Sequence, residues 1–180
     1  MNSTATKTIW AVDPTHSELT FRVKHLMITN VKGEFRNFDA SIESEGEDFG
    51  RAKVSATIDA ASIDTNNSDR DNHLRSADFF DVDNHKEITF EGTAFNKLDE
   101  DNYQLKGLLT MLGISKEIVL DVEFGGFVKD PYGNEKAGFS VQGKFNRKDW
   151  GLTWNAALEA GGVMVSDEVR VNGEIQFVKK

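Results

Sequence analysis

Apolar and polar residues alternate with a period of two in segment after segment of this chain. In Ser17–His25, for example, Leu19, Phe21 and Val23 share one phase, while polar and charged residues fill the other. Because side chains on a β-strand point alternately to opposite faces, this pattern predicts strands with one buried face. Rows of the same kind occur at residues 8–13, 31–42, 52–58, 88–94, 103–111, 118–124, 137–145 and 169–177.

About eight strands joined by short turns predict an all-β fold, either an antiparallel barrel or a sandwich. Glycines on the inward phase add a constraint, because a packed sandwich core needs large side chains there. Two explanations stay open: barrel strands coil strongly at glycine, or the glycines leave room for a ligand. The inward glycines are Gly33, Gly92, Gly107, Gly143 and Gly173.

The inward rows around these glycines carry no charge, so a ligand enclosed by them is expected to be apolar along most of its length. A strand of nine residues spans roughly 30 Å, which suits an elongated hydrocarbon. At Gly107 we expect open space, so that a leucine there hinders lipid uptake without unfolding the barrel. The predicted lumen residues are Phe21, Phe35, Phe90, Gly107, Leu109, Phe139, Gly143 and Ile175.

The stretch Ser62–Val82 interrupts the alternation and predicts a short helical insert around residues 66–80. Ser68 is the predicted N-cap, with Asp71 three residues later at the spacing of a capping box. A second short helix is expected within residues 156–162, where two glycines follow an alanine-rich run.

The insert carries the chain's main polar cluster, because Arg70 and His73 fall on one face of the predicted helix and Phe79 and Phe80 follow it. Two interpretations remain open: a surface crossover helix, and a polar gate over an apolar cavity. In the second, Arg70, His73, Phe79 and Phe80 hold the ligand's head group or form the gate. Two tryptophans near the C-terminus, Trp150 and Trp154, are expected to cap the barrel.

The chain has 180 residues, no cysteine and a net charge of −9. A single domain over residues 1–180 is expected, with residues 1–7 flexible. The negative charge argues against nucleic acid or an anionic membrane as a partner, and no run reaches transmembrane length. Because the N-terminus lacks an apolar leader, we expect a cytoplasmic location, or a periplasmic one if a signal has been removed. A homodimer is left open.

Neither catalysis nor metal binding is expected. His16 together with Asp71 and His73 invites a metal, but the spacing lacks the repeated pairs of a zinc site. His16 and Ser17 are adjacent, and adjacent strand residues point to opposite faces, so they do not form a catalytic pair. There is no nucleophile elbow or phosphate-binding loop. We therefore predict no catalytic residues, no metal and no required cofactor.

The residues also match a family, which the chain resembles from Trp10 nearly to its C-terminus. The chain resembles the YceI-like proteins, which are lipocalin-like barrels that bind polyisoprenoid lipids. The resemblance implies an extended eight-stranded antiparallel barrel around a long lipid tail, with the helical insert closing part of the mouth. The matching motifs are Trp10–Asp13, His16-Ser17, Phe21, His25, Gly33–Phe35, Ser62–Thr65, Arg70–Leu74, Asp78–Phe80, Ile88–Phe90, Gly107–Thr110, Gly113 and Asp149–Gly151.

The function expected from the residues and the resemblance together is a carrier for an elongated isoprenoid-type lipid. A polyprenyl alcohol or a quinone-like molecule would fit, in lipid storage, transport or a stress response. Such a lipid is the bound molecule we expect. The alternative is an enzyme or accessory factor that acts on an isoprenoid or another amphiphile with the cluster near Arg70 and His73.

Overall fold

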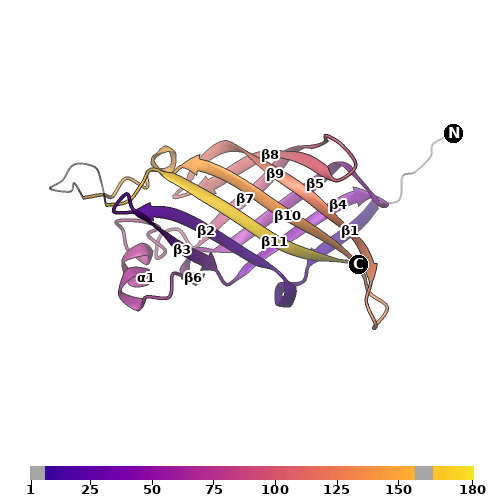
Figure 1. Ribbon diagram of the computed structural model, residues 1–180, viewed down its shortest axis with the longest axis horizontal. Coiled ribbons are helices and arrows are strands. Elements are labelled where there is room, and N and C mark those ends of the chain that lie inside the picture. The colour runs from indigo at the N-terminus through magenta and orange to yellow at the C-terminus, as the bar shows by residue number, and fades with distance from the viewer. Residues whose placement is uncertain (1–6, 157–163) are drawn as a thin grey trace.

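The computed structural model describes residues 7–156 and 164–180. Eleven β-strands form one antiparallel sheet, which closes into a long barrel where β1 pairs with β11 (Figure 1). The strands are β1 (Lys7–Val12), β2 (Glu18–His25), β3 (Thr29–Phe35), β4 (Phe38–Glu45), β5 (Asp48–Asp59), β6 (Ile63–Asp64), β7 (Glu87–Lys97), β8 (Asn102–Met111), β9 (Ile114–Lys129), β10 (Glu135–Asn146) and β11 (Glu168–Lys179). The helices are α1 (Ser68–Arg75) and the 3₁₀ turns η1 (Pro14–His16), η2 (Ala60–Ser62) and η3 (Arg147–Trp150).

Three of the eleven strands continue the strand before them after a short break, so the barrel wall consists of eight long strands. β1 and β2 pair with opposite halves of β11, β3 and β4 pair with β2 and β1, and β6 extends β5 beyond η2. The predicted eight-stranded antiparallel barrel is therefore confirmed. The row expected over residues 31–42 is broken at Arg36 and Asn37, between β3 and β4.

The break between β1 and β2 follows from Pro14, which has no backbone N–H to give to a strand partner. Pro14 instead begins η1, and the Asp13 carboxylate caps this turn by accepting a hydrogen bond from the Thr15 backbone N–H at 3.1 Å. The bend lets the long strand formed by β1 and β2 follow the curved barrel wall over its full length. The same residues therefore serve as strand end and turn cap.

Helix α1 lies within the predicted insert, but its cap differs from the prediction. Asn67 is the N-cap and accepts from the Arg70 backbone N–H at 3.0 Å, so the assignment of Ser68 is wrong. Asp71 does not complete a capping box, because its carboxylate accepts from the Thr65 N–H and hydroxyl instead. Asn66 takes a left-handed conformation (φ 63°), which turns the chain one residue earlier than the sequence indicated.

The barrel has two unlike ends, seen at left and right in Figure 1. The helix end carries α1, the β2–β3 turn (Leu26–Ile28), the β8–β9 turn and η3. The terminal end carries the start of β1, the end of β11 and the β4–β5, β7–β8 and β9–β10 turns. At the helix end the sheet has a gap, because β6 pairs with β3 while β7 begins at Glu87, opposite Asp59 of β5. Residues 65–86, including α1, connect across that gap.

Some expectations concern residues outside the described ranges. Lys7 is the first residue of β1, while the rest of the segment expected to be flexible, residues 1–6, lies outside them. The expected second helix also lies outside, except for Ala156, which is not helical. No helix in the described part of the chain is long and apolar enough to cross a membrane.

Candidate functional site: an apolar cavity in the barrel

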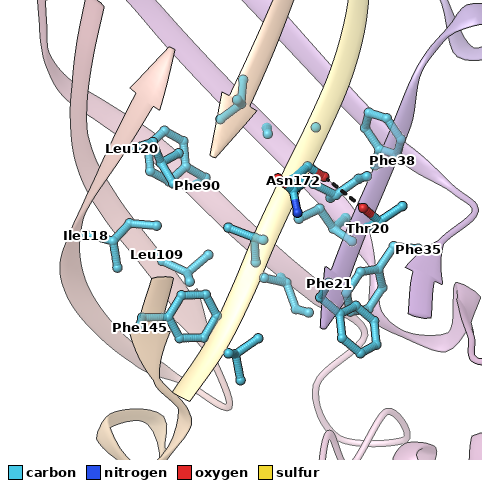
Figure 2. A pocket seen from close by; sticks show the side chains of 18 of the residues that line it. Thr20, Phe21, Phe35, Phe38, Phe90, Leu109, Ile118, Leu120, Phe145 and Asn172 are labelled. Atoms are coloured by element: carbon cyan, nitrogen blue, oxygen red, sulfur yellow. Dashed lines mark hydrogen bonds between the residues drawn. The ribbon is translucent and has the colours of Figure 1, made fainter. Parts of the chain in front are cut away.

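A cavity of about 250 Å³ lies inside the barrel (Figure 2). Its lining reaches from Ile42 and Phe177, toward the terminal end, to Leu74 and Leu152, toward the helix end. The alternation of apolar and polar residues along the strands explains this lining, because the long strands turn their apolar side chains inward. The cavity is thus built by the whole barrel rather than by one local motif.

Almost the entire lining is hydrocarbon. Among the described residues that line it, three have polar side chains, namely Thr20, Arg147 and Asn172. The Thr20 hydroxyl donates to the Asn172 backbone carbonyl at 3.4 Å, within the wall (Figure 2). Arg147 turns its guanidinium to carbonyls of the wall, so mainly its aliphatic stem remains for the cavity. The site offers apolar contact and no charge to a bound molecule.

Arg147 ties the chain together at the helix end and was missed in the sequence. Its guanidinium is 3% exposed and donates to the backbone carbonyls of Leu152 at 2.6 Å and Ser166 at 2.9 Å. Burial lowers the pKa of this group, and the nearby Asp167 carboxylate partly offsets that effect. A sequence signal existed, because Arg147 falls on the inward phase that continues from Val141, Gly143 and Phe145.

Six of the eight predicted lumen residues line the cavity, and two glycines do not. The cavity's lining includes Phe21, Phe35, Phe90, Leu109, Phe139 and Ile175 but neither Gly107 nor Gly143. Whether these residues bind a ligand stays a prediction. Their positions show that the inward rows were identified correctly.

The expectation of open space at Gly107 is wrong. A Cβ atom there would overlap the ring of Phe90 and would lie 2.6 Å from the Glu91 carbonyl oxygen. At Gly33 a Cβ would likewise meet the ring of Phe21, its direct partner on β2. These glycines make room for aromatic rings of the barrel's own wall, an arrangement known as aromatic rescue. Open space for a ligand is therefore the wrong explanation at these two positions, whereas strand coiling at glycine stays a prediction.

At the terminal end, aromatic rings pack together and close the barrel. Phe49 lies 5.5 Å from Trp10, 5.1 Å from Phe139 and 5.6 Å from Phe127, measured between ring centroids. Trp10 is 1% exposed, and its indole N–H donates to the Ser44 hydroxyl at 3.0 Å. Phe49 belongs to no inward row that we recognised, because it follows a turn.

At the helix end, the two phenylalanines of the insert reach the cavity, as the gate interpretation requires. Phe79 and Phe80 both line it, and Phe80 meets Phe35 edge to face at 5.9 Å. Phe79 packs on Trp154 at 5.4 Å. Trp150 is buried in the wall and donates its indole N–H to the Leu109 carbonyl. The two tryptophans therefore cover this end of the barrel.

Arg70 and His73 lie outside the cavity lining. Arg70 is exposed and donates to the hydroxyl and the carbonyl of Thr65, both at 2.7 Å. His73 is hydrogen-bonded to Asp78 at 2.9 Å and packs edge-on against Trp154. Both side chains thus support the insert, and their predicted contact with a head group stays a prediction.

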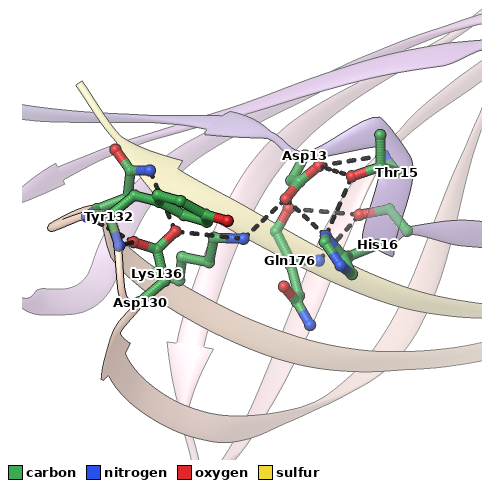
Figure 3. A network of polar contacts seen from close by, with 9 residues as sticks. Asp13, Thr15, His16, Asp130, Tyr132, Lys136 and Gln176 are labelled. Carbon is green, nitrogen blue, oxygen red and sulfur yellow. Dashed lines mark hydrogen bonds and ion pairs between the residues drawn. The ribbon is translucent and has the colours of Figure 1, made fainter.

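A second polar network lies at the terminal end, on the break between β1 and β2 (Figure 3). The Asp13 carboxylate accepts from Lys136 at 2.9 Å, from Thr15 and from His16. These partners, Lys136 first, hold the pKa of Asp13 far below its usual range. The pKa of Asp130 is lowered too, chiefly by the Asn134 backbone N–H. The network joins η1 to β10 and contains no unused acid or base. Within the described residues, no three acidic or histidine side chains converge as metal ligands.

A closed antiparallel barrel with a hydrocarbon-lined interior and a covered end is the architecture of the lipocalin-like binding barrels. The comparisons with known proteins then give the family. Residues 10–177 match the YceI-like domain, and the chain belongs to the YceI-like family.

Individual relatives agree with this assignment. The chain is 43% identical over 171 residues to a UPF0312 protein of Staphylococcus aureus, covering 94% of this chain and 97% of that one. It is similar to the crystal structure of the Campylobacter jejuni YCEI protein (TM-score 0.75, 38% identity, 87% and 90% covered). It also shares its fold with a polyisoprenoid binding domain from Saccharophagus degradans (TM-score 0.65, 15% identity, 95% and 98% covered).

Proposed function

We propose that this protein binds an elongated isoprenoid-type lipid by enclosing its hydrocarbon chain in the barrel. The observation that carries the proposal is the cavity, which extends toward both ends of the barrel and is lined almost wholly by apolar side chains. Burial of apolar surface contributes about 25 cal/mol per Å², so a long chain gains affinity along its whole length. A compact polar ligand would find no hydrogen-bond partner there.

The isoprenoid character is supported by the family and by one neighbour of the same fold, described as a polyisoprenoid binding domain. A polyprenyl alcohol or a quinone-like molecule fits an apolar cavity of this shape. The protein would then serve as a carrier or store of this lipid, in transport or in a stress response. No further cofactor is needed for such a role.

The cavity is narrow for this purpose. Its volume of about 250 Å³ is just below the roughly 300–1,000 Å³ of most small-molecule sites. Rings such as Phe21, Phe90 and Phe145 line it from different sides (Figure 2). We propose that these rings rotate toward the wall when a chain enters, so that the lipid replaces contacts the rings now make with each other.

The head group of the ligand is expected outside the cavity, at the helix end. The described part of the lining is almost wholly apolar, whereas Arg70 and His73 lie outside it on the insert. We propose an uncharged or weakly polar head group, because Asp69 and Asp71 in the first turn of α1 would repel an anion. A polyprenyl pyrophosphate is therefore a poorer ligand than the matching alcohol.

Binding is favoured over catalysis by where the polar side chains point. The alternative function needs Arg70 and His73 to meet the bound molecule, but both are engaged with Thr65 and Asp78 of the insert itself. Among the described lining residues, Thr20 and Arg147 donate their hydrogen bonds to carbonyls of the wall. We therefore propose a carrier rather than an enzyme.

Native mass spectrometry of the purified protein tests the proposal. We expect extra mass that disappears on denaturation, and uptake of added polyprenyl alcohol or long-chain quinone by delipidated protein. Val141→Trp fills the lumen and should abolish uptake, while the control Gln142→Trp points outward on the same strand and should not. A homogeneous apo mass with no uptake, or equal uptake by both variants, would contradict the proposal.

A further inference from the structure

The β2–β3 turn at the helix end consists of three exposed apolar residues. Leu26, Met27 and Ile28 are 37%, 52% and 80% exposed. Turns in water are normally built from glycine, asparagine, aspartate or proline. The turns at the terminal end obey that rule, with Gly46-Glu47 and Asp130–Asn134 as examples. Three large apolar side chains at one solvent-exposed tip need another explanation.

The backbone of the same turn is strained. Leu26 and Met27 have φ angles of 53° and 64°, a left-handed conformation that asparagine or glycine adopts far more easily. The sequence thus keeps leucine and methionine where small or polar residues would be more stable. Strain retained at an exposed position points to a function for the side chains.

The strand register brings cations together beside this turn. Lys144 of β10 pairs with Arg170 of β11, Arg170 pairs with Arg22 of β2, and Arg22 pairs with Lys32 of β3. All four side chains are exposed and lie on the outer face of neighbouring strands. We call these four residues the cation row. Lys24, two residues from the tip, adds a fifth charge.

The cation row is unfavourable for the isolated protein, since like charges directly opposite each other destabilise a sheet. The Glu168 carboxylate lies beside two of these cations, with Oε1 3.7 Å from Lys144 Nζ and Oε2 3.6 Å from Arg170 Nε. Within the part of the chain that the structure describes, Arg22 and Lys32 form no ion pair. The segment between Glu18 and Glu34 contains no acidic residue, although the whole chain has a net charge of −9. The hairpin segment therefore carries a local positive charge on a chain that is negative as a whole.

We propose that the β2–β3 hairpin docks the helix end of the barrel on an anionic lipid bilayer. Leu26, Met27 and Ile28 enter the boundary between head groups and acyl chains, and the cation row faces the lipid phosphates. Arg22 and Lys32 each lie four positions along their strands from the tip, or about 13 Å. Interfacial amphipathic helices bury their apolar face by about 5–10 Å, and a similar depth of the tip brings the long cationic side chains level with the head groups.

Both features together select a bilayer as the partner. A nucleic acid or an acidic protein would attract the cation row but would leave the apolar tip in water. A neutral apolar partner would leave the cations unmatched. Phe21 and Val23, on the inner face of β2, line the cavity, so a docked hairpin places the cavity next to the membrane. The purpose of docking, exchange of the lipid, rests on the proposed function, but bilayer binding itself does not.

Flotation with lipid vesicles tests the proposal without any isoprenoid. The full-length protein is mixed with phosphatidylcholine vesicles that contain 30% phosphatidylglycerol, or with pure phosphatidylcholine vesicles. We expect binding to the anionic vesicles only, weakened by 0.5 M NaCl because salt screens the charges. Absence of binding to anionic vesicles at low salt would overturn the proposal.

Two variants separate docking from folding. Leu26→Asn combined with Met27→Gly supplies residues suited to left-handed turns, so the melting temperature should stay or rise while vesicle binding falls at least tenfold. Arg22→Glu places an acid between Arg170 and Lys32, so the sheet should gain stability while vesicle binding falls roughly tenfold. Retained binding in either folded variant would overturn the proposal.

Matched controls lie at exposed positions elsewhere. Val128→Ser combined with Tyr132→Ser removes two apolar side chains that are 63% and 90% exposed at the terminal end. Lys53→Glu makes the same charge change as Arg22→Glu on β5. We expect both controls to bind vesicles like the unchanged protein. Equal losses in controls and test variants, or light scattering that shows the tip buried between two copies of the chain, would contradict a hairpin-specific docking site.

Discussion

Aromatic rings cover both ends of the barrel, and at the helix end arginine side chains add hydrogen bonds to the backbone. At the terminal end, Trp10, Phe49 and Phe139 pack ring against ring, so closure comes from apolar burial. At the helix end, arginine side chains hold the backbone by donating to carbonyls: Arg147 to Leu152, and Arg75 to Ala61. Ring packing has many contacts that are lost together, whereas hydrogen bonds to carbonyls can be exchanged with water one at a time. We therefore expect the helix end to open more easily than the terminal end.

The turns at the two ends also differ in the residues that build them. The terminal end has acidic turns around Glu47, Asp99 and Asp130, which suit contact with water. The helix end has Leu26–Ile28 in the β2–β3 turn and Leu112 in the β8–β9 turn, both with left-handed residues. The terminal end also exposes Leu98, Val128 and Tyr132, but among the described residues the Leu26–Ile28 turn is the one place where three consecutive exposed side chains are all large and apolar.

The largest expected effect tests closure by packing. Phe49→Ala at the terminal end should lower the free energy of unfolding by about 3–5 kcal/mol, since it leaves a cavity among buried rings. Phe80→Ala at the helix end should cost clearly less, because Phe80 is only half buried. Urea unfolding measures both. Equal losses would remove the distinction between the ends.

The next effect tests closure by hydrogen bonds. Arg147→Met keeps an apolar stem against the cavity but leaves the carbonyls of Leu152 and Ser166 without a donor, at an expected cost of about 3 kcal/mol. The exposed neighbour serves as the control, and Lys148→Met should change stability by less than about 0.5 kcal/mol. If Arg147→Met is neutral in urea unfolding, the helix end does not depend on this side chain.

Substitutions in the strands between the two ends provide a reference for the stability effects at both ends. Gly107→Ala should cost about 2 kcal/mol, because its Cβ would press on Phe90 and on the Glu91 carbonyl. Gly138→Ala should be neutral or slightly stabilising, since nothing lies within 4 Å of a Cβ there. Melting temperatures of delipidated protein measure the pair. A neutral Gly107→Ala would bring back the idea that this glycine leaves open space.

The smallest effect concerns the polar network of the terminal end. Asp13→Asn should cost about 1.5 kcal/mol at pH 7, because Lys136 loses its charged partner. The pKa of Asp13 is lower in the folded than in the unfolded protein, so its contribution is complete above about pH 4 and is lost as the pH falls below that value. Unfolding of both proteins between pH 7 and pH 3 should show their difference shrinking on acidification. A constant difference would mean that Asp13 acts without its charge.

The fold and the cavity lining followed from local pattern. An alternation with a period of two shows which side chains lie on the same face of a strand. This does not depend on the rest of the chain. Rows such as Leu19, Phe21 and Val23 were therefore assigned correctly, as was the insert. The cap was missed by one residue, because Asn67 and Ser68 are equally good caps and the left-handed Asn66 decides between them.

The meaning of the inward glycines could not be read from the sequence. A glycine on an inward row looks the same whether it faces a ligand or a ring. Which it is depends on the neighbour across the strand pair, and that is Phe90 for Gly107 and Phe21 for Gly33. For the same reason Arg70 and His73 formed a cluster in the sequence, while in the structure each bonds a different part of the insert.

The sequence by itself determined an antiparallel all-β fold with an apolar interior and a net negative charge, because composition and alternation are properties of single segments, and the family resemblance selected the barrel. Only the tertiary structure decided where charge and apolar surface gather. Lys144, Arg170, Arg22 and Lys32 are far apart in the chain, and the register of four strands aligns them beside the Leu26–Ile28 tip. The net charge of the whole chain argued against an anionic membrane as a partner. A bilayer would contact one end of the barrel, however. The electric field at that end is set by the charges within about 10 Å of it.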